Sequence, residues 1–265
     1  MDYFAKVGAY WIEEFNVDGW RLDVANEVDK GFWRNFKKAC RKANPESVLI
    51  AEIWENAEQW IFEDMFDSAM NYEFRKHVRD FVAFNKIDAQ GFEARMTQML
   101  LRYPTGMVQG QLNLLDSHDV SRFMYLLNSV DKYKLSLVLL YTCVGIPCLF
   151  YGDELGVTGC KEFEYRAPMP WDNPKINLKD FILALSELRK DETFVYGSYK
   201  TVLTSGNVYS FVRSLGDKTY QITINAGENG CEMPSGIGQH ECVLTNNDSK
   251  DMLKPYAYLI ERLEA

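Results

Sequence analysis

The sequence has no uninterrupted apolar run close to the roughly 20 residues that a membrane-spanning helix requires, so we expect no membrane partner. It also has no excess of basic residues. Its 29 lysines and arginines are outnumbered by 38 aspartates and glutamates, and the formal net charge is −9 over 265 residues. Proteins that bind nucleic acids through the phosphates need a basic face, so this charge balance argues against a nucleic-acid partner.

Cysteine motifs are absent as well. The six cysteines form no C-x-x-C pair and lie near no histidine cluster: Cys40, Cys143, Cys148, Cys160, Cys231 and Cys242. This spacing signals neither a structural zinc site nor a redox motif. We expect buried free thiols in a reducing compartment, which favours a cytoplasmic location.

Short apolar strands alternate with amphipathic helices up to about residue 190, which is typical of a parallel sheet with helical crossovers. The expected strands are 18–24, 47–53, 66–71, 111–115 and 147–151. The expected helices are 2–15, 29–43, 72–83, 88–102, 130–144 and 178–190, and Asp88 is the predicted cap of one of them.

The pattern changes after about residue 193. The segments VYSFVRSL and TYQITINA flank Gly216-Asp217, which predicts antiparallel strands joined by a tight turn. We therefore expect an α/β domain over residues 1–190 and an all-β domain over residues 191–265.

The stretch GWRLDV places an arginine and an aspartate two positions apart in a strand-like run. Alternation along a strand sends such positions to one face, so Arg21 and Asp23 should point the same way. The pair is either a structural ion pair or a working carboxylate held next to a fixed cation.

Further polar groups follow the other expected strands, and functional groups in parallel sheets collect at such carboxyl ends. The candidates are Arg21 and Asp23, Glu52, the group Asp116, His118 and Asp119, and the pair Asp153 and Glu154. Several carboxylates in one cleft suit acid/base and nucleophilic chemistry on an acetal. They would also suit Mg²⁺ or Ca²⁺, although the sequence shows no calcium-loop spacing.

Three segments, GWRLDVANE, AEIWE and NLLDSHD, resemble in this order the conserved regions of the α-amylase family, glycoside hydrolase family 13. MNY at 70–72, GIPCLFYGDELG at 145–156 and RAPMPWD at 166–172 extend the resemblance. VANEV and MNY are most similar to the neopullulanase, maltogenic amylase and cyclomaltodextrinase branch. The resemblance implies an α-glucan hydrolase that cleaves α-1,4 bonds with retention of configuration, with α-1,6 bonds as a second target.

The resemblance also assigns catalytic roles. It makes Asp23 the nucleophile and Glu52 the general acid/base. Asp119 would hold sugar hydroxyls and favour the distorted ring of the transition state. Arg21 would keep Asp23 ionised, because a nearby cation lowers the pKa of a carboxylate.

Substrate-binding roles fall to residues in the same segments. The resemblance implies that His118 hydrogen-bonds substrate hydroxyls. Trp54, Tyr72 and Trp171 could stack on sugar faces or pack in the core, and the sequence leaves both interpretations open. No organic cofactor is implied. The resemblance leaves calcium possible, but no ligand set for it is recognisable in this sequence.

Aligned by these motifs, GWRLDV corresponds to the fourth strand of the family barrel and GIPCLFYGDE to the eighth. The expected fold is therefore a partial (β/α)8 TIM barrel, strands 4 to 8, followed by a C-terminal antiparallel β-sandwich. Such a half-barrel exposes two edge strands, so we expect a homo-oligomer or a complementing N-terminal half as partner. The alternative is a catalytically inactive fragment that self-associates or binds oligosaccharide weakly.

Overall fold

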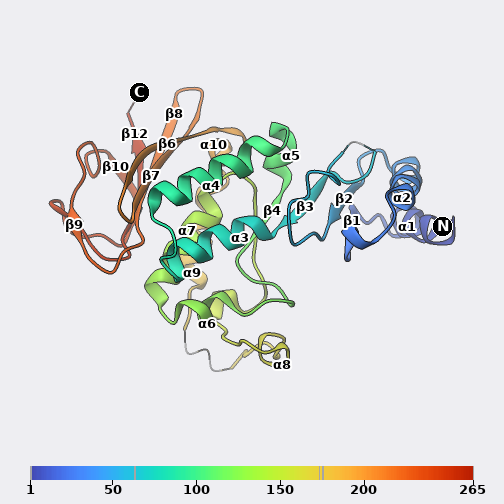
Figure 1. The fold of residues 1–265 in the computed structure, drawn as a ribbon, viewed down its shortest axis with the longest axis horizontal. Helices are drawn as coiled ribbons and strands as arrows, with labels where there is room; N and C mark the ends of the chain where they lie inside the picture. Colours follow the sequence, from blue (N-terminus) through green and yellow to red (C-terminus); the bar gives the residue numbers. More distant parts are fainter. Residues whose placement is uncertain (1, 63, 173, 175, 265) are drawn as a thin grey trace.

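The computed structural model describes residues 2–62, 64–172, 174 and 176–264 (Figure 1). Its first sheet has five strands: β1 (Gly19–Leu22), β2 (Val48–Ala51), β3 (Ser68–Asn71), β4 (Leu112–Leu114) and β5 (Ile146–Cys148). The strands lie in the order of the sequence, and every neighbouring pair is parallel. Each strand overlaps a predicted range, so the predicted parallel sheet is confirmed.

Helices precede, connect and follow these strands. The longer ones are α1 (Asp2–Phe15), α2 (Lys30–Ala43), α3 (Tyr72–Val78), α4 (Ala89–Arg102), α7 (Val130–Thr142) and α9 (Lys179–Leu188). All six match predicted helices, and the Asp88 carboxylate caps α4 by accepting from the Gly91 amide at 2.8 Å. Predicted helix 72–83 continues beyond α3 as a π-helical turn, η2 (Arg79–Ala83). The 3-10 turns are η1 (Ala25–Glu27) and η3 (Asp153–Leu155).

Four short helices were not predicted: α5 (Thr105–Gly110), α6 (Phe123–Leu127), α8 (Glu162–Tyr165) and α10 (Glu192–Tyr196). Each has at most six residues, too few to show a helical period in the sequence. No helix in the described part of the chain combines the length and the apolar character needed to cross a membrane.

The C-terminal part is a second sheet, and it is antiparallel as predicted. Its order is β10 (Glu241–Thr245), β12 (Tyr258–Leu263), β8 (Lys218–Asn225), β7 (Val208–Leu215) and β6 (Ser198–Ser205). Strands β9 (Cys231–Glu232) and β11 (Met252–Leu253) form a separate pair. Gly216 turns the β7–β8 hairpin with a φ of 60°, a conformation that glycine adopts without strain.

One hydrophobic core contains side chains of the C-terminal sheet together with side chains of the helices α3, α4, α7 and α9. Phe92 of α4 meets the ring of Tyr209 of β7 edge to face at 5.2 Å. Arg213 of β7 is fully buried and donates to the carbonyl of Thr142, at the end of α7, at 2.7 Å. The two predicted domains, residues 1–190 and 191–265, therefore share one continuous core. The domain boundary between residues 190 and 191 stays a prediction.

Candidate functional site

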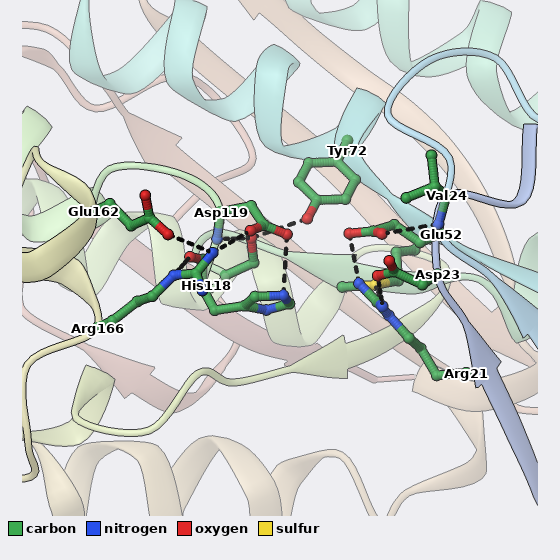
Figure 2. Close-up of polar contacts among 11 residues, drawn as sticks. Arg21, Asp23, Val24, Glu52, Tyr72, His118, Asp119, Glu162 and Arg166 are labelled. Carbon is green, nitrogen blue, oxygen red and sulfur yellow. Dashed lines mark hydrogen bonds and ion pairs between the residues drawn. The ribbon is translucent and has the colours of Figure 1, made fainter. Parts of the chain in front are cut away.

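A cleft of about 680 Å³ lies at the carboxyl ends of β1, β2 and β4 (Figure 2). Its lining residues are Asp23, Val24, Asn26, Glu27, Glu52, Trp54, Glu55, His118, Asp119 and Arg166. The structure thus brings three predicted carboxylates together with His118 and Trp54. These side chains come from segments up to 96 residues apart (119 − 23 = 96), which the parallel topology places at one edge of the sheet.

Arg21 lies between two of the carboxylates. Its Nη1 is 2.6 Å from Asp23 Oδ1, and its Nη2 is 2.5 Å from Glu52 Oε1. Hydrogen bonds from Arg21, and next from Glu52, hold the pKa of Asp23 below its usual range. The predicted contact between Arg21 and Asp23 is therefore present, and the guanidinium also joins Asp23 to Glu52.

Glu52 is 3% exposed and is anchored at the start of the loop that follows β2. Its amide donates to the carbonyl of Leu22 at 2.9 Å, and its carbonyl accepts from the amide of Ala25 at 3.1 Å. The amide of Val24 donates to Glu52 Oε2 at 3.3 Å. The loops after β1 and β2 are therefore fastened to each other beside the two carboxylates.

Val24 follows Asp23 in a left-handed conformation, with φ 44° and ψ 45°. This conformation is unfavourable for a β-branched residue. It is held by neighbouring contacts, because fully buried Ala25 also accepts from the Trp33 indole N–H at 2.8 Å. The backbone next to Asp23 is therefore strained, and the surrounding structure maintains the strain.

Val24→Gly is expected to raise the free energy of unfolding by about 1 kcal/mol, because glycine adopts the left-handed conformation without steric cost. Urea unfolding would measure it. Val243→Gly is the matched control, since Val243 is also exposed but has no positive φ in β10. We expect the control to lower stability. A loss of stability in both variants would contradict the strain at Val24.

The carboxylate of Asp119 has a partner on each oxygen (Figure 2). His118 Nε2 lies 3.0 Å from Oδ2, and Arg166 Nη2 lies 2.8 Å from Oδ1. Arg166 Nε also donates to the carbonyl of His118 at 2.7 Å. Sequence reasoning missed Arg166 as a site residue, although it opens the RAPMPWD segment that supported the family resemblance. It also did not assign Asn26, Glu27 or Glu55 to the cleft.

The structure gives the aromatic candidates different surroundings. Trp54 is 52% exposed and lines the cleft, whereas Tyr72 is 6% exposed and is absent from the lining. The two rings are stacked, with centroids 5.0 Å apart. Trp171 is exposed and also lies outside the cleft lining.

The remaining strand-end acids lie outside the cleft. Asp116 and Asp153 are buried, and Asp153 Oδ1 is 3.4 Å from Nη1 of the fully buried Arg122. Burial, and next the charge of Asp153, raises the pKa of Asp116 well above its usual value. Burial raises the pKa of Asp153 to about 6. Glu154, the remaining acid of this group, does not line the cleft either. Asp116 and Asp153 therefore form a buried acidic pair outside the cleft lining.

The buried acidic pair predicts a pH dependence of stability. Because the folded state keeps a proton that the unfolded state loses near pH 4, stability should fall as the pH rises from about 4 through 6. Asp116→Asn mimics the protonated acid and should therefore make this fall in stability smaller. Urea unfolding at pH 4.5 and 7.5 would measure it. Equal pH dependence in both proteins would contradict proton retention by Asp116 in the folded state.

Metal ligation is the alternative interpretation of the carboxylates. Across the residues that the structure describes, no group of three or more His, Cys, Asp or Glu side chains is arranged to hold a metal ion. Asp23 and Glu52 instead share one guanidinium, and Asp119 is paired with His118 and Arg166.

Comparison with known proteins identifies relatives along most of the chain. The family described as alpha amylase, catalytic domain, matches residues 2–197. A cyclomaltodextrinase from Thermoanaerobacter pseudethanolicus is 40% identical over 84% of this chain and 40% of its own length. Neopullulanase 2 from Thermoactinomyces vulgaris is 37% identical over 84% of this chain and 39% of its own. The chain thus spans about two fifths of the length of these curated relatives.

Solved structures agree with the sequence relatives. The cyclic α-maltosyl-(1→6)-maltose hydrolase from Arthrobacter globiformis superposes with a TM-score of 0.88 and 29% identity, over 100% of this chain and 60% of that one. The family match covers the parallel sheet and the whole cleft, and the structural match extends through the C-terminal antiparallel sheet. The chain belongs to the α-amylase family of glycoside hydrolases.

Proposed function

We propose that this chain carries the catalytic residues of a retaining α-glucan hydrolase. The observation that supports this most directly is the position of Arg21, which contacts Asp23 at 2.6 Å and Glu52 at 2.5 Å in one cleft. The shared guanidinium holds one exposed and one buried carboxylate close together. Asp119 faces the same cleft from the loop after β4.

The proposed reaction has two steps. Ionised Asp23 attacks the anomeric carbon, while Glu52 gives its proton to the departing glycosidic oxygen, so that a glycosyl-enzyme ester forms. Glu52 then takes a proton from water as the water attacks the same carbon, and Asp23 leaves. Each step inverts the configuration, so the product has the α-configuration of the substrate. Asp119 and His118 bind sugar hydroxyls, and Trp54 stacks on a sugar face.

The names of the relatives support the substrate class. They include cyclomaltodextrinase and neopullulanase, and a debranching enzyme from Nostoc punctiforme is structurally similar. We therefore propose α-1,4-linked cyclic and linear maltodextrins as substrates, with α-1,6 bonds as a further target. The reaction uses side chains of this chain and no organic cofactor. A relative from Bacillus subtilis is named an intracellular maltogenic amylase, which supports a cytoplasmic location.

The second candidate function is an inactive fragment that self-associates or binds oligosaccharide weakly. It is favoured by β1 and β5, each of which pairs along only one side among the described residues. Unpaired edges of this kind favour association. A second copy, or a separate polypeptide that completes the barrel, is the proposed partner in either case.

The deciding experiment measures reducing sugar released from β-cyclodextrin and maltotriose, with molar mass followed by light scattering. We expect turnover, and NMR should show the α-anomer as the first product. Release of the β-anomer would contradict the retaining mechanism. A chain that is folded by circular dichroism and releases no sugar would support the inactive fragment instead.

A further inference from the structure

Glu52 follows strand β2 and Asp119 follows strand β4. A series of side-chain contacts links these two parts of the cleft. Trp54 follows Glu52 after β2, and its ring is stacked on Tyr72 at 5.0 Å with an interplanar angle of 21°. Tyr72 begins α3 directly after β3. Figure 2 shows its hydroxyl pointing into the space between Asp119 and Glu52.

The path continues through Ser117. The hydroxyls of Tyr72 and Ser117 lie 2.9 Å apart, and Ser117 Oγ accepts from the Asp119 amide at 3.2 Å. Ser117 is 3% exposed and Tyr72 is 6% exposed, so water has little access to replace either bond. The amide of Asp119 is therefore fixed by a serine whose orientation depends on Tyr72.

The Tyr72 hydroxyl is suited to a fixed role. Burial raises the pKa of Tyr72 to about 12, against an opposing effect of the Ser117 hydrogen bond and with smaller contributions from the charges of Glu52 and Asp119. The hydroxyl therefore stays neutral and keeps its proton throughout the range in which a glycoside hydrolase works. Its ring cannot move toward the cleft without losing the contact with Trp54.

We propose that Tyr72 is a positioning residue for hydrolysis: through Ser117 it sets the place of Asp119, and through its ring it supports Trp54 beside Glu52. This role rests on the proposed function. It differs from sugar stacking, because Tyr72 is buried under Trp54 and does not line the cleft. It also differs from simple packing, because the hydroxyl and not only the ring is required.

The test separates the hydroxyl from the ring. Tyr72→Phe keeps the stacked ring and removes one oxygen, and Ser117→Ala removes the other end of the bond. Each should lower kcat on β-cyclodextrin by about tenfold and change KM by less than about twofold, because Asp119 is expected to bind most strongly in the transition state. The double variant should be no slower than Ser117→Ala alone, since that change already removes both the Tyr72–Ser117 bond and the bond from the Asp119 amide.

A second readout does not need turnover. Hydrogen exchange at the Asp119 amide, read by NMR or on a peptide covering 116–123, should be faster in Tyr72→Phe and in Ser117→Ala. Tyr3→Phe is the matched control, because Tyr3 lies on α1 with 72% of its surface exposed and outside the cleft lining. It should leave both kcat and this exchange rate unchanged.

The outcomes are distinct. Wild-type kinetics and wild-type exchange in Tyr72→Phe would overturn the inference, and so would losses that multiply in the double variant. If the wild-type chain hydrolyses neither β-cyclodextrin nor maltotriose, the proposed function fails. The exchange measurement then decides alone whether Tyr72 holds the Asp119 loop.

Discussion

Glu52→Gln is expected to lower kcat on maltotriose by about 10²–10⁴-fold, the contribution typical of a positioned general acid/base. Asp23→Asn should lower it at least as far, because an amide cannot form the glycosyl ester. Both changes preserve shape, and both residues contact Arg21. Reducing-sugar release by each purified variant measures the effect.

Glu55→Gln is the matched control for charge, since Glu55 lines the same cleft. It should change kcat by less than about tenfold, because no step of the reaction assigns it a proton. A loss as large as that of Glu52→Gln would move the acid/base role toward Glu55.

The two catalytic variants should also differ from each other. α-Glucosyl fluoride has a leaving group that needs little protonation, so Glu52→Gln should still form the glycosyl-enzyme and then hydrolyse it slowly. Mass spectrometry should find the added hexosyl group on the peptide that contains Asp23. Asp23→Asn should show no such adduct. A hexosyl group on any other carboxylate would reassign the nucleophile.

The sequence predicted the features that depend on local periodicity or on a contiguous motif. All five strands of the parallel sheet and six helices follow from apolar spacing, and Asp23, Glu52 and Asp119 lie within the three matching segments. A parallel sheet brings the ends of its strands to one edge, so the convergence of these acids follows from the predicted topology.

What the sequence could not predict depends on contacts between distant segments. Arg166 reaches Asp119 from 47 residues further along the chain (166 − 119 = 47), and no spacing rule marks it. Burial in the folded chain also determines which acidic side chains reach the cleft. Asp116 looks like Asp119 in the motif LLDSHD, yet it is 3% exposed and paired with Asp153, whereas Asp119 faces the cleft. Apolar spacing does not separate these two aspartates: the family resemblance assigns the role to Asp119, and the tertiary fold shows why Asp116 cannot share it.

The hydrophobic core shared by the two parts of the chain also shows why a change in the sequence pattern does not locate a domain boundary. The change after residue 193 is real, since helices give way to antiparallel strands there. However, Arg213 of β7 reaches back to the carbonyls of Thr142 and Phe194, at 2.7 and 3.0 Å. The change in secondary structure thus does not coincide with a break in packing.

Arg122→Met is expected to lower the free energy of unfolding by about 3–5 kcal/mol, the range seen when one partner of a buried ion pair is removed. Arg122 is fully buried, and its guanidinium donates to the carbonyls of Tyr151 at 2.6 Å and Tyr165 at 3.1 Å. Methionine would fill part of the space but leave these carbonyls and Asp153 without their donor. Urea unfolding at pH 7.5 gives the value.

Arg262→Met is the control, because Arg262 pairs with Glu241 at 3.5 Å on the exposed side of β12 and should contribute less than about 1 kcal/mol.

Arg122 also connects the two chain segments that carry the partners of Asp119 in the cleft, His118 and Arg166. Its own segment follows Asp119, and Tyr165 precedes Arg166. Arg122→Met should therefore make the segment 159–166, which contains α8, more sensitive to proteolysis than the rest of the chain, well below the unfolding midpoint. Uniform sensitivity along the chain would show that Arg122 stabilises the fold as a whole and does not hold the cleft wall in particular.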